Sequence, residues 1–173
     1  MNQLKKLAYN SLFGVSFLLL FSISSLYSQQ PAIEVTVFTD VIDTDGNGVI
    51  SSGDVANFTI KAKNTGNIAL TGISLTASFT GVNNSAASLS GGVSYTGSSG
   101  GSSVGNLSIA SGGEVANYVA SYTFNGAGIS AGGVKLSIAA LASSAPLTNN
   151  VSDTSDDGND TDGDTTGDHN IIV

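Results

Sequence analysis

The sequence predicts an all-β protein, folded as a β-sandwich of seven or eight short strands. Hydrophobic and polar residues alternate with a period of two from Pro31 onward, which is typical of strands with one buried face. Turns rich in Gly, Ser and Asn separate these alternating runs. No window after the N-terminal 29 residues has a convincing helical period. With 173 residues, the chain is long enough for one such domain.

The first half of the chain contains three clear strand patterns, at 33–41, 55–63 and 73–80. A turn at 64–67 separates the second from the third. The residues expected to face the core are Ile33, Val35, Val37, Val41, Ala56, Phe58, Ile60, Ala62, Ile73, Leu75, Ala77 and Phe79. These strands are predicted to form the first part of the sandwich.

The second half is less regular. The Gly- and Ser-rich residues 81–106 offer Leu89, Val93, Tyr95 and Val104 as anchors for short strands. Further strands are predicted to begin at Leu107 and to span 118–124, 134–140 and 147–151. The segment 125–133 between two of them is expected to be a Gly-rich connection without a helix.

Residues 1–29 have the pattern of a secretory signal peptide: Lys5 and Lys6 precede a short apolar run and a stretch of small residues. The alternative is an uncleaved membrane anchor, but the run is short for a bilayer span. We therefore expect a secreted or cell-surface protein. Because the chain contains no Cys, neither a lipid-modified Cys nor a disulfide is available.

The predicted organisation is a signal peptide at 1–29, a β-sandwich domain at 30–152 and an acidic, flexible linker or tail at 153–173. The apolar end of that tail, from Ile171 to Val173, is expected to begin a strand of a segment that is not in the sequence. This expectation suggests that the chain is a fragment of a longer protein.

Charge excludes several classes of partner. After signal cleavage, 3 Lys face 13 acidic residues, which gives a net charge of −10. Nucleic acids and anionic membrane surfaces are not expected partners, because no basic surface is available to bind phosphates. No further apolar run is long enough to span a membrane after the signal is removed.

The segment Asp43–Asp54 matches a twelve-residue calcium loop at most positions. Such loops place oxygen ligands at positions one, three, five, seven, nine and twelve, with Gly at position six for a sharp turn. Gly48 is at that sixth position. The predicted ligands are Asp43, Asp45, Asn47, Val49 through its carbonyl, Ser51 and Asp54. The sequence therefore predicts Ca²⁺ as the cofactor.

Two features depart from a helix–loop–helix calcium site: position twelve is Asp54 rather than Glu, and both flanks have strand patterns. The alternative interpretation is an acidic turn in solvent, since Asp, Asn and Gly are common turn residues. The spacing of Asp160, Asp162, Asp164 and Asp168 in the tail suggests a second, weaker metal site. A solvated run of charges explains that pattern equally well.

The sequence favours a protein that is not an enzyme. Its only His, His169, lies in the acidic tail, and without a Cys or a core His the usual nucleophile triads cannot form. A carboxylate pair for glycoside hydrolysis would need Glu34 and Glu114, both of which are predicted on outward positions or turns. Tyr95, Tyr118 and Tyr122 could form a sugar-binding face, although Tyr118 and Tyr122 alternate as core residues do.

Three stretches of the chain resemble the immunoglobulin-like conserved repeat domains of bacterial cell-surface proteins, notably gliding-motility-associated adhesins. The first consists of residues 43–50, 53–54, 58–60 and 64–71, the second of 111–115 leading to 120–122, and the third of 151–160. The likeness spans most of residues 31–162. The resemblance implies an immunoglobulin-like sandwich that serves as a spacer or adhesive module on the cell surface without catalysis. Under it, Asp43, Asp45, Asn47 and Asp54 form the acidic loop.

The chain departs from that family in its Gly- and Ser-rich segment 81–106, and it holds a single copy of a domain that usually occurs in tandem. The expected function is a structural or adhesion module stabilised by calcium, monomeric by itself. Its expected partners are neighbouring surface domains or an extracellular glycan or protein. The alternative is a carbohydrate-binding module of an exported protein.

Overall fold

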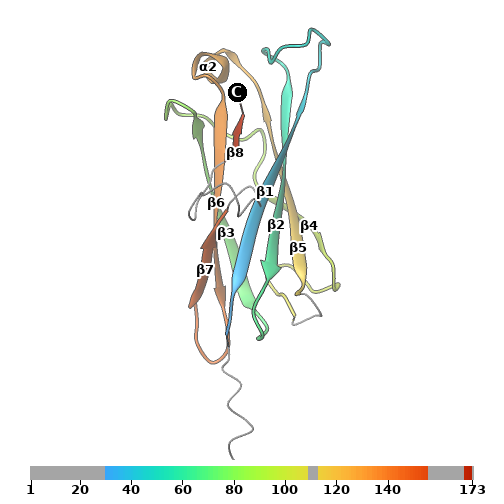
Figure 1. The fold of residues 1–173 in the computed structure, drawn as a ribbon, viewed down its shortest axis with the longest axis vertical. Helices are drawn as coiled ribbons and strands as arrows, with labels where there is room; N and C mark the ends of the chain where they lie inside the picture. Colours follow the sequence, from blue (N-terminus) through green and yellow to red (C-terminus); the bar gives the residue numbers. More distant parts are fainter. Residues whose placement is uncertain (1–29, 109–112, 156–169, 173) are drawn as a thin grey trace, which may run out of the picture.

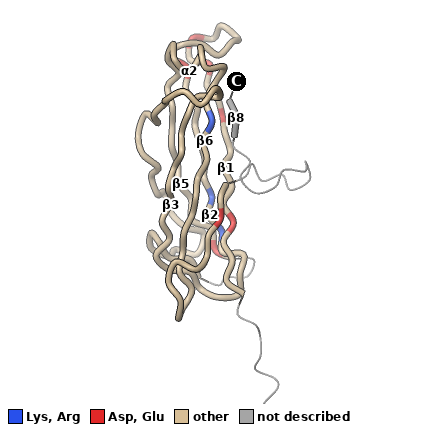
Figure 2. The backbone as a smooth tube through the Cα atoms, turned by 90° about the vertical axis from the view of Figure 1, so that its left-hand side faces the viewer, with Lys and Arg blue, Asp and Glu red and all other residues tan. Residues whose placement is uncertain are grey.

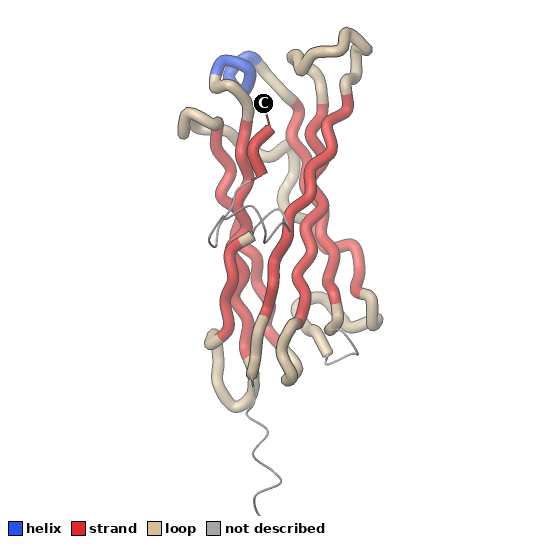
Figure 3. The backbone as a smooth tube through the Cα atoms, in the orientation of Figure 1, coloured by secondary structure: helices blue, strands red, loops and turns tan. Residues whose placement is uncertain are grey.

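The computed structural model of the protein describes residues 30–108, 113–155 and 170–172. Within these residues the chain forms two antiparallel β-sheets whose strands run along the long axis of the molecule (Figures 1 and 3). The prediction of an all-β sandwich is therefore confirmed. The predicted signal peptide lies outside the described residues.

The first sheet has the strand order β1-β2-β5-β4. Its strands are β1 (Ile33–Ile42), β2 (Val55–Asn64), β4 (Ser94–Ser98) and β5 (Val115–Thr123). β1 and β2 pair over their full lengths, from Ile33 opposite Asn64 to Ile42 opposite Val55. β4 pairs with only part of β5, and its register shifts between Tyr95 and Gly97. β2 and β5 are thus the central strands of this sheet.

The second sheet has the order β3-β6-β7, with β8 also paired to β6. Its strands are β3 (Thr71–Gly81), β6 (Val134–Ser143), β7 (Val151–Thr154) and β8 (Asn170–Ile172). The register of β3 on β6 shifts between Thr71 and Ser74. β6 is the centre of this sheet, because β3 lies on one side of it and β7 and β8 lie on the other.

The core lies between the two sheets, and the alternating residues of their strands fill it. Phe58 packs edge-on against Phe79 with ring centroids 5.9 Å apart, and Phe79 in turn contacts Tyr122 at 5.1 Å. Burial of these apolar side chains is the main stabilising contribution, since no disulfide is possible. The residues predicted to face inward on β1 and β2 are buried apart from Val41, which packs against the core in part.

Several local predictions for the second half were wrong. A short helix, α2 (Gly126–Ser130), forms in the connection predicted to lack one. The side chain of Asn125 caps it by accepting hydrogen bonds from the amides of Ala127 and Gly128, both at 3.0 Å. Gly81 is the last residue of β3, and of the described residues in 82–106 only those of β4 form a strand. The strand predicted at 147–151 instead begins at Val151.

The C-terminal part of the described chain returns to the domain rather than leaving it. β7 continues to Thr154, past the predicted domain boundary at Ser152. β8 lies within the predicted tail and pairs with β6, with Ile172 opposite Val134. The described residues of this apolar end, Ile171 and Ile172, thus pair with a strand of the same chain.

Glu114 is buried, although the sequence suggested an outward or turn position. Its carboxylate accepts hydrogen bonds from side chains or amides of Ser98, Ser102 and Ser108 at 2.6–3.1 Å. These hydrogen bonds hold the Ser- and Gly-rich segment that precedes β5 against the first sheet. Glu34, by contrast, is exposed on β1.

Charged residues are sparse along the described part of the chain (Figure 2). Lys61 lies 4.9 Å from the centre of the Phe38 ring on the outer face of the first sheet. Among the residues that the structure describes, no helix is long and apolar enough to cross a membrane.

Candidate metal site and surface groove

The β1–β2 hairpin positions the acidic loop. Ile42 and Val55 form the last pair of the ladder, so residues 43–54 must reverse the chain at the end of the sandwich. In Figure 1 this loop and α2 lie at the same end of the molecule. Gly46 and Gly48 have φ angles of 69° and 80°, which glycine adopts without a steric penalty. The Gly positions of the predicted calcium loop are therefore required by its backbone.

The structure brings three of the predicted ligands together. Carboxylate oxygens of Asp43, Asp45 and Asp54 all lie within 4.8 Å of one another. Two oxygens that bind one Ca²⁺ at 2.3–2.6 Å can be no further apart than about 5 Å. The spacing is therefore compatible with a shared calcium ion.

Asp43 is held by the loop backbone. Its Oδ1 accepts hydrogen bonds from the amides of Gly46 at 2.7 Å and Asn47 at 3.3 Å, and its Oδ2 accepts one from Gly48 at 2.7 Å. The amide of Gly48 makes the largest contribution to lowering the pKa of this carboxyl below its ordinary value of 3.8. A carboxylate has about four acceptor positions, so Asp43 retains capacity for a cation.

Asp54 is the anchored member of the cluster. Its side chain is 1% exposed, and it accepts hydrogen bonds from the amides of Thr44 at 2.7 Å and Ser51 at 2.6 Å. Its backbone carbonyl accepts a hydrogen bond from the Phe124 amide at 2.8 Å, which extends the contact between β2 and β5. The loop is thus fixed to the sandwich at its last position, while Asp43 and Asp45 are exposed.

The side chains of Asn47 and Ser51 contact the carboxylate cluster by hydrogen bonds to Asp45. The Nδ2 of Asn47 donates to Asp45 Oδ2 at 2.8 Å, and the hydroxyl of Ser51 donates to the same oxygen at 3.2 Å. The Oδ1 of Asn47 instead accepts from the Val49 amide at 2.8 Å. Asn47 would have to rotate its amide to offer oxygen to an ion. Val49 itself is 64% exposed, and the group through which it contacts Asn47 is its amide.

Close packing of three carboxylates favours a cation. Like charges at this separation repel one another, and backbone amides compensate only part of that charge. Calcium accepts six to eight oxygen ligands and tolerates irregular geometry, which suits a cluster of carboxylates beside a hydroxyl and a carboxamide. The same loop can also exist as a hydrogen-bonded acidic turn, which the amide contacts of Asp43 and Asp54 already complete.

The other predicted sites have different outcomes. Asp160, Asp162, Asp164, Asp168 and His169 lie outside the described residues. Tyr118 and Tyr122 are buried, and the ring of Tyr95 packs against Tyr118 with centroids 5.4 Å apart. The Tyr95 hydroxyl donates to the Ser102 carbonyl at 2.9 Å. These three residues therefore form no exposed aromatic face.

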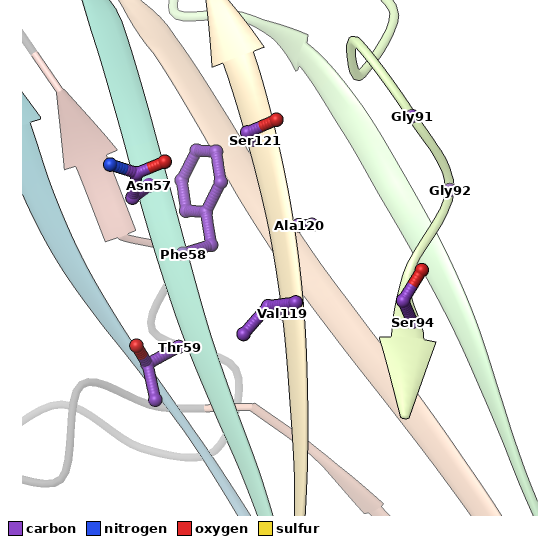
Figure 4. Close-up of a pocket in the computed structure, with 9 residues that line it drawn as sticks. All are labelled: Asn57, Phe58, Thr59, Gly91, Gly92, Ser94, Val119, Ala120 and Ser121. Atoms are coloured by element: carbon purple, nitrogen blue, oxygen red, sulfur yellow. The ribbon is translucent and has the colours of Figure 1, made fainter. Parts of the chain in front are cut away.

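A groove lies instead on the outer side of the first sheet, where the chain before β4 diverges from β5 (Figure 4). It has a volume of about 390 Å³. The amide of Ser90 donates a hydrogen bond to the Ser121 carbonyl of β5 at 2.8 Å. Gly91 and Gly92, which connect this contact to β4, therefore pass over the edge of the sheet. The groove is lined by Asn57, Phe58, Thr59, Gly91, Gly92, Ser94, Val119, Ala120 and Ser121.

The groove residues were not identified from the sequence. Asn57, Thr59 and Ser121 occupy ordinary outward positions in strand patterns, and nothing in their spacing distinguishes them from other exposed strand residues. The only available signal is the Gly91-Gly92 pair, which permits the chain to leave a strand edge.

Comparison of the chain with models of protein families, with curated proteins and with solved structures finds no match.

Proposed function

We propose that the protein is a non-enzymatic structural or adhesion module of an exported protein, and that Ca²⁺ bound in the loop Asp43–Asp54 stabilises it. The observation that carries the proposal is the convergence of Asp43, Asp45 and Asp54 within 4.8 Å at the end of a rigid hairpin. Asn47 and Ser51, which contact Asp45, complete the oxygen-rich surroundings of that point.

The strand order supports an immunoglobulin-like form of the sandwich. In constant-type immunoglobulin domains, strands A-B-E-D form one sheet and C-F-G form the other. The orders β1-β2-β5-β4 and β3-β6-β7 correspond to these when the first seven strands are lettered in sequence. Such sandwiches serve widely as extracellular modules, but fold alone does not define function.

Calcium would act on stability through the hairpin. Asp54 is already fixed to the sandwich through Phe124, whereas Asp43 and Asp45 belong to the exposed part of the loop. An ion shared by the three would join the exposed part to the anchored part and relieve their repulsion. The folded state would then bind the ion in preference to the unfolded chain, which raises the free energy of unfolding.

The test is a calcium titration of the protein by calorimetry, combined with thermal unfolding in calcium and in chelator. At one hundred times the Kd, one bound ion adds about 2.7 kcal/mol to the free energy of unfolding. Magnesium at the same concentration is the control, since it prefers octahedral sites that retain water. Identical melting curves in calcium and chelator, with no heat of binding, would contradict the proposal.

The groove on the outer face of the first sheet supports a second candidate, carbohydrate binding. The polar side chains that line it are uncharged and form hydrogen bonds of the kind that recognise sugar hydroxyls. They are Asn57, Thr59, Ser94 and Ser121. Binding to a glycan array that is lost in Asn57→Ala and retained in Asp45→Asn would favour this candidate. No binding across polysaccharides would remove it and leave the calcium proposal intact.

A further inference from the structure

One edge of β6 is covered by two separate pieces of chain. β7 pairs with residues 139–142, and Ser155 extends this contact by donating its amide to the Ile138 carbonyl at 2.8 Å. β8 pairs with residues 134–136 of the same strand. Both pieces run antiparallel to β6, so together they occupy one strand position that is interrupted once.

The chain between β7 and β8 is much longer than is needed to connect their pairing positions on β6. Ser155 lies opposite Ile138 and Asn170 lies opposite Leu136, so only Ser137 separates their partners on β6. In an uninterrupted strand, one residue would bridge that interval. The chain instead contains the 14 residues 156–169 between them, 6 of which are Asp.

The length of this connection permits β8 to reach another molecule. Fourteen residues can extend to about 46–50 Å. The whole of β6, with 10 residues, is only about 33 Å long.

The site on β6 is built to receive a strand. Val134 and Leu136, which pair with β8, are fully buried, and Lys135 between them donates a hydrogen bond from its Nζ to Asn84 Oδ1 at 2.7 Å. Addition of a strand to such an edge is driven by main-chain hydrogen bonds, which require no particular partner side chains. The segment with the matching register is Asn170–Ile172.

We propose that residues Val134–Leu136 form a strand-acceptor site that also takes the segment Asn170–Ile172 of a second copy of this chain. Reciprocal exchange then links two copies through β8 while each sandwich remains intact. At low concentration the segment of the same chain occupies the site, because its effective concentration is higher. At high concentration the copies exchange strands. This proposal does not depend on calcium.

Directed disulfide formation tests the exchange, because the native chain has no Cys to interfere. Lys135 and Ile171 lie directly opposite each other in the β6–β8 register. Two single variants, Lys135→Cys and Ile171→Cys, are mixed at high concentration and oxidised. A disulfide-linked heterodimer between them is expected, because only exchange brings these positions of different chains together.

The matched control is a mixture of Ala139→Cys and Thr154→Cys, which are opposite each other on β6 and β7, before the long connection. This mixture should form severalfold less heterodimer, because β7 has no comparable free length of chain. Equal yields from the two mixtures would overturn the proposal. So would a Lys135→Cys/Ile171→Cys double variant that links only within one chain while the mixed single variants stay unlinked.

Discussion

Ser108 donates two hydrogen bonds to one oxygen of Glu114, from its amide at 2.6 Å and from its hydroxyl at 2.8 Å. Because Glu114 also accepts hydrogen bonds from Ser98 and Ser102, one buried carboxylate joins the end of β4 to two points of the chain that follows it. Hydrogen bonds to an ionised group are about twice as strong as those between neutral groups. Glu114 thus takes the place of an apolar anchor in a segment that has few of them.

Glu114→Gln is expected to lower the free energy of unfolding by about 3 kcal/mol, because an amide cannot accept all of these donors and leaves some buried without a partner. Urea unfolding at neutral pH measures the change. Glu34→Gln is the control: Glu34 is exposed, and its replacement should change stability by no more than about 0.5 kcal/mol. Similar values for the two variants would show that the buried network contributes little.

Stability should also fall on acidification. The amide of Ser108 and the hydroxyl of Ser102 are the main causes that hold the pKa of Glu114 far below its ordinary value of 4.5. A depressed pKa in the folded state means that the unfolded chain takes up the proton first as pH falls. The contribution of Glu114 is therefore complete above about pH 5 and decreases steadily below it. Unfolding free energies at pH 7 and pH 3 should differ less in Glu114→Gln than in the native protein.

The sequence predicted the central strands well because each has one apolar and one polar face. The alternation of Val35, Val37, Phe58 and Ile60 is confirmed by their burial. The prediction failed where other forces decide the structure. Glu114 is buried because serines far from it in sequence satisfy its charge, and α2 forms because Asn125 caps it. Neither effect has a periodic pattern.

The acidic loop could be predicted in outline but not in detail. The sequence pattern grouped Asp43, Asp45 and Asp54, whose carboxylate oxygens lie within 4.8 Å of one another. It could not indicate the amide orientation of Asn47, which depends on the local hydrogen bonds to Asp45 and Val49. The groove beside Gly91 and Gly92 arises from the path of the chain away from β5, which no local sequence pattern encodes.

Asp45→Asn should separate calcium affinity from intrinsic stability. The substitution removes one of three clustered charges and is expected to weaken calcium binding by about tenfold or more. Without calcium, relief of repulsion should leave the melting temperature unchanged or slightly raised. Asp40→Asn, at an exposed position of β1 outside the carboxylate cluster, is the control and should retain native affinity. Calorimetric titration of both variants measures the difference.

Gly113→Ala should be strongly destabilising. Gly113 has a φ of +80°, and an added Cβ would overlap the carbonyl oxygen of Asn64. Gly132→Ala separates the two causes, since Gly132 has nearly the same φ, +78°, but nothing within 4 Å of the added atom. The loss in thermal stability should be clearly larger for Gly113→Ala. Equal losses of thermal stability in the two variants would show that backbone strain alone, and not the overlap with Asn64, destabilises Gly113→Ala.

Asn125→Ala should lower the free energy of unfolding by about 1 kcal/mol, because it removes the cap of α2. It also removes the acceptor for the Tyr122 hydroxyl at 3.2 Å. Tyr122→Phe isolates that second contact and should have a smaller effect. Thermal unfolding of the two variants and the native protein measures both contributions, and a larger loss in Tyr122→Phe would contradict the capping role.

The register shifts in β3 and β4 have a consequence for how copies of the protein behave when crowded. Each of these two strands lies at one edge of its sheet and departs from regular pairing near a glycine, Gly72 or Gly97. Isolated bridges from Leu107 and Ala86 further obstruct β3 near its two ends. A kinked or partly blocked edge is a poor template for open-ended stacking of sheets. Sideways pairing of densely packed copies through these two edges is therefore disfavoured.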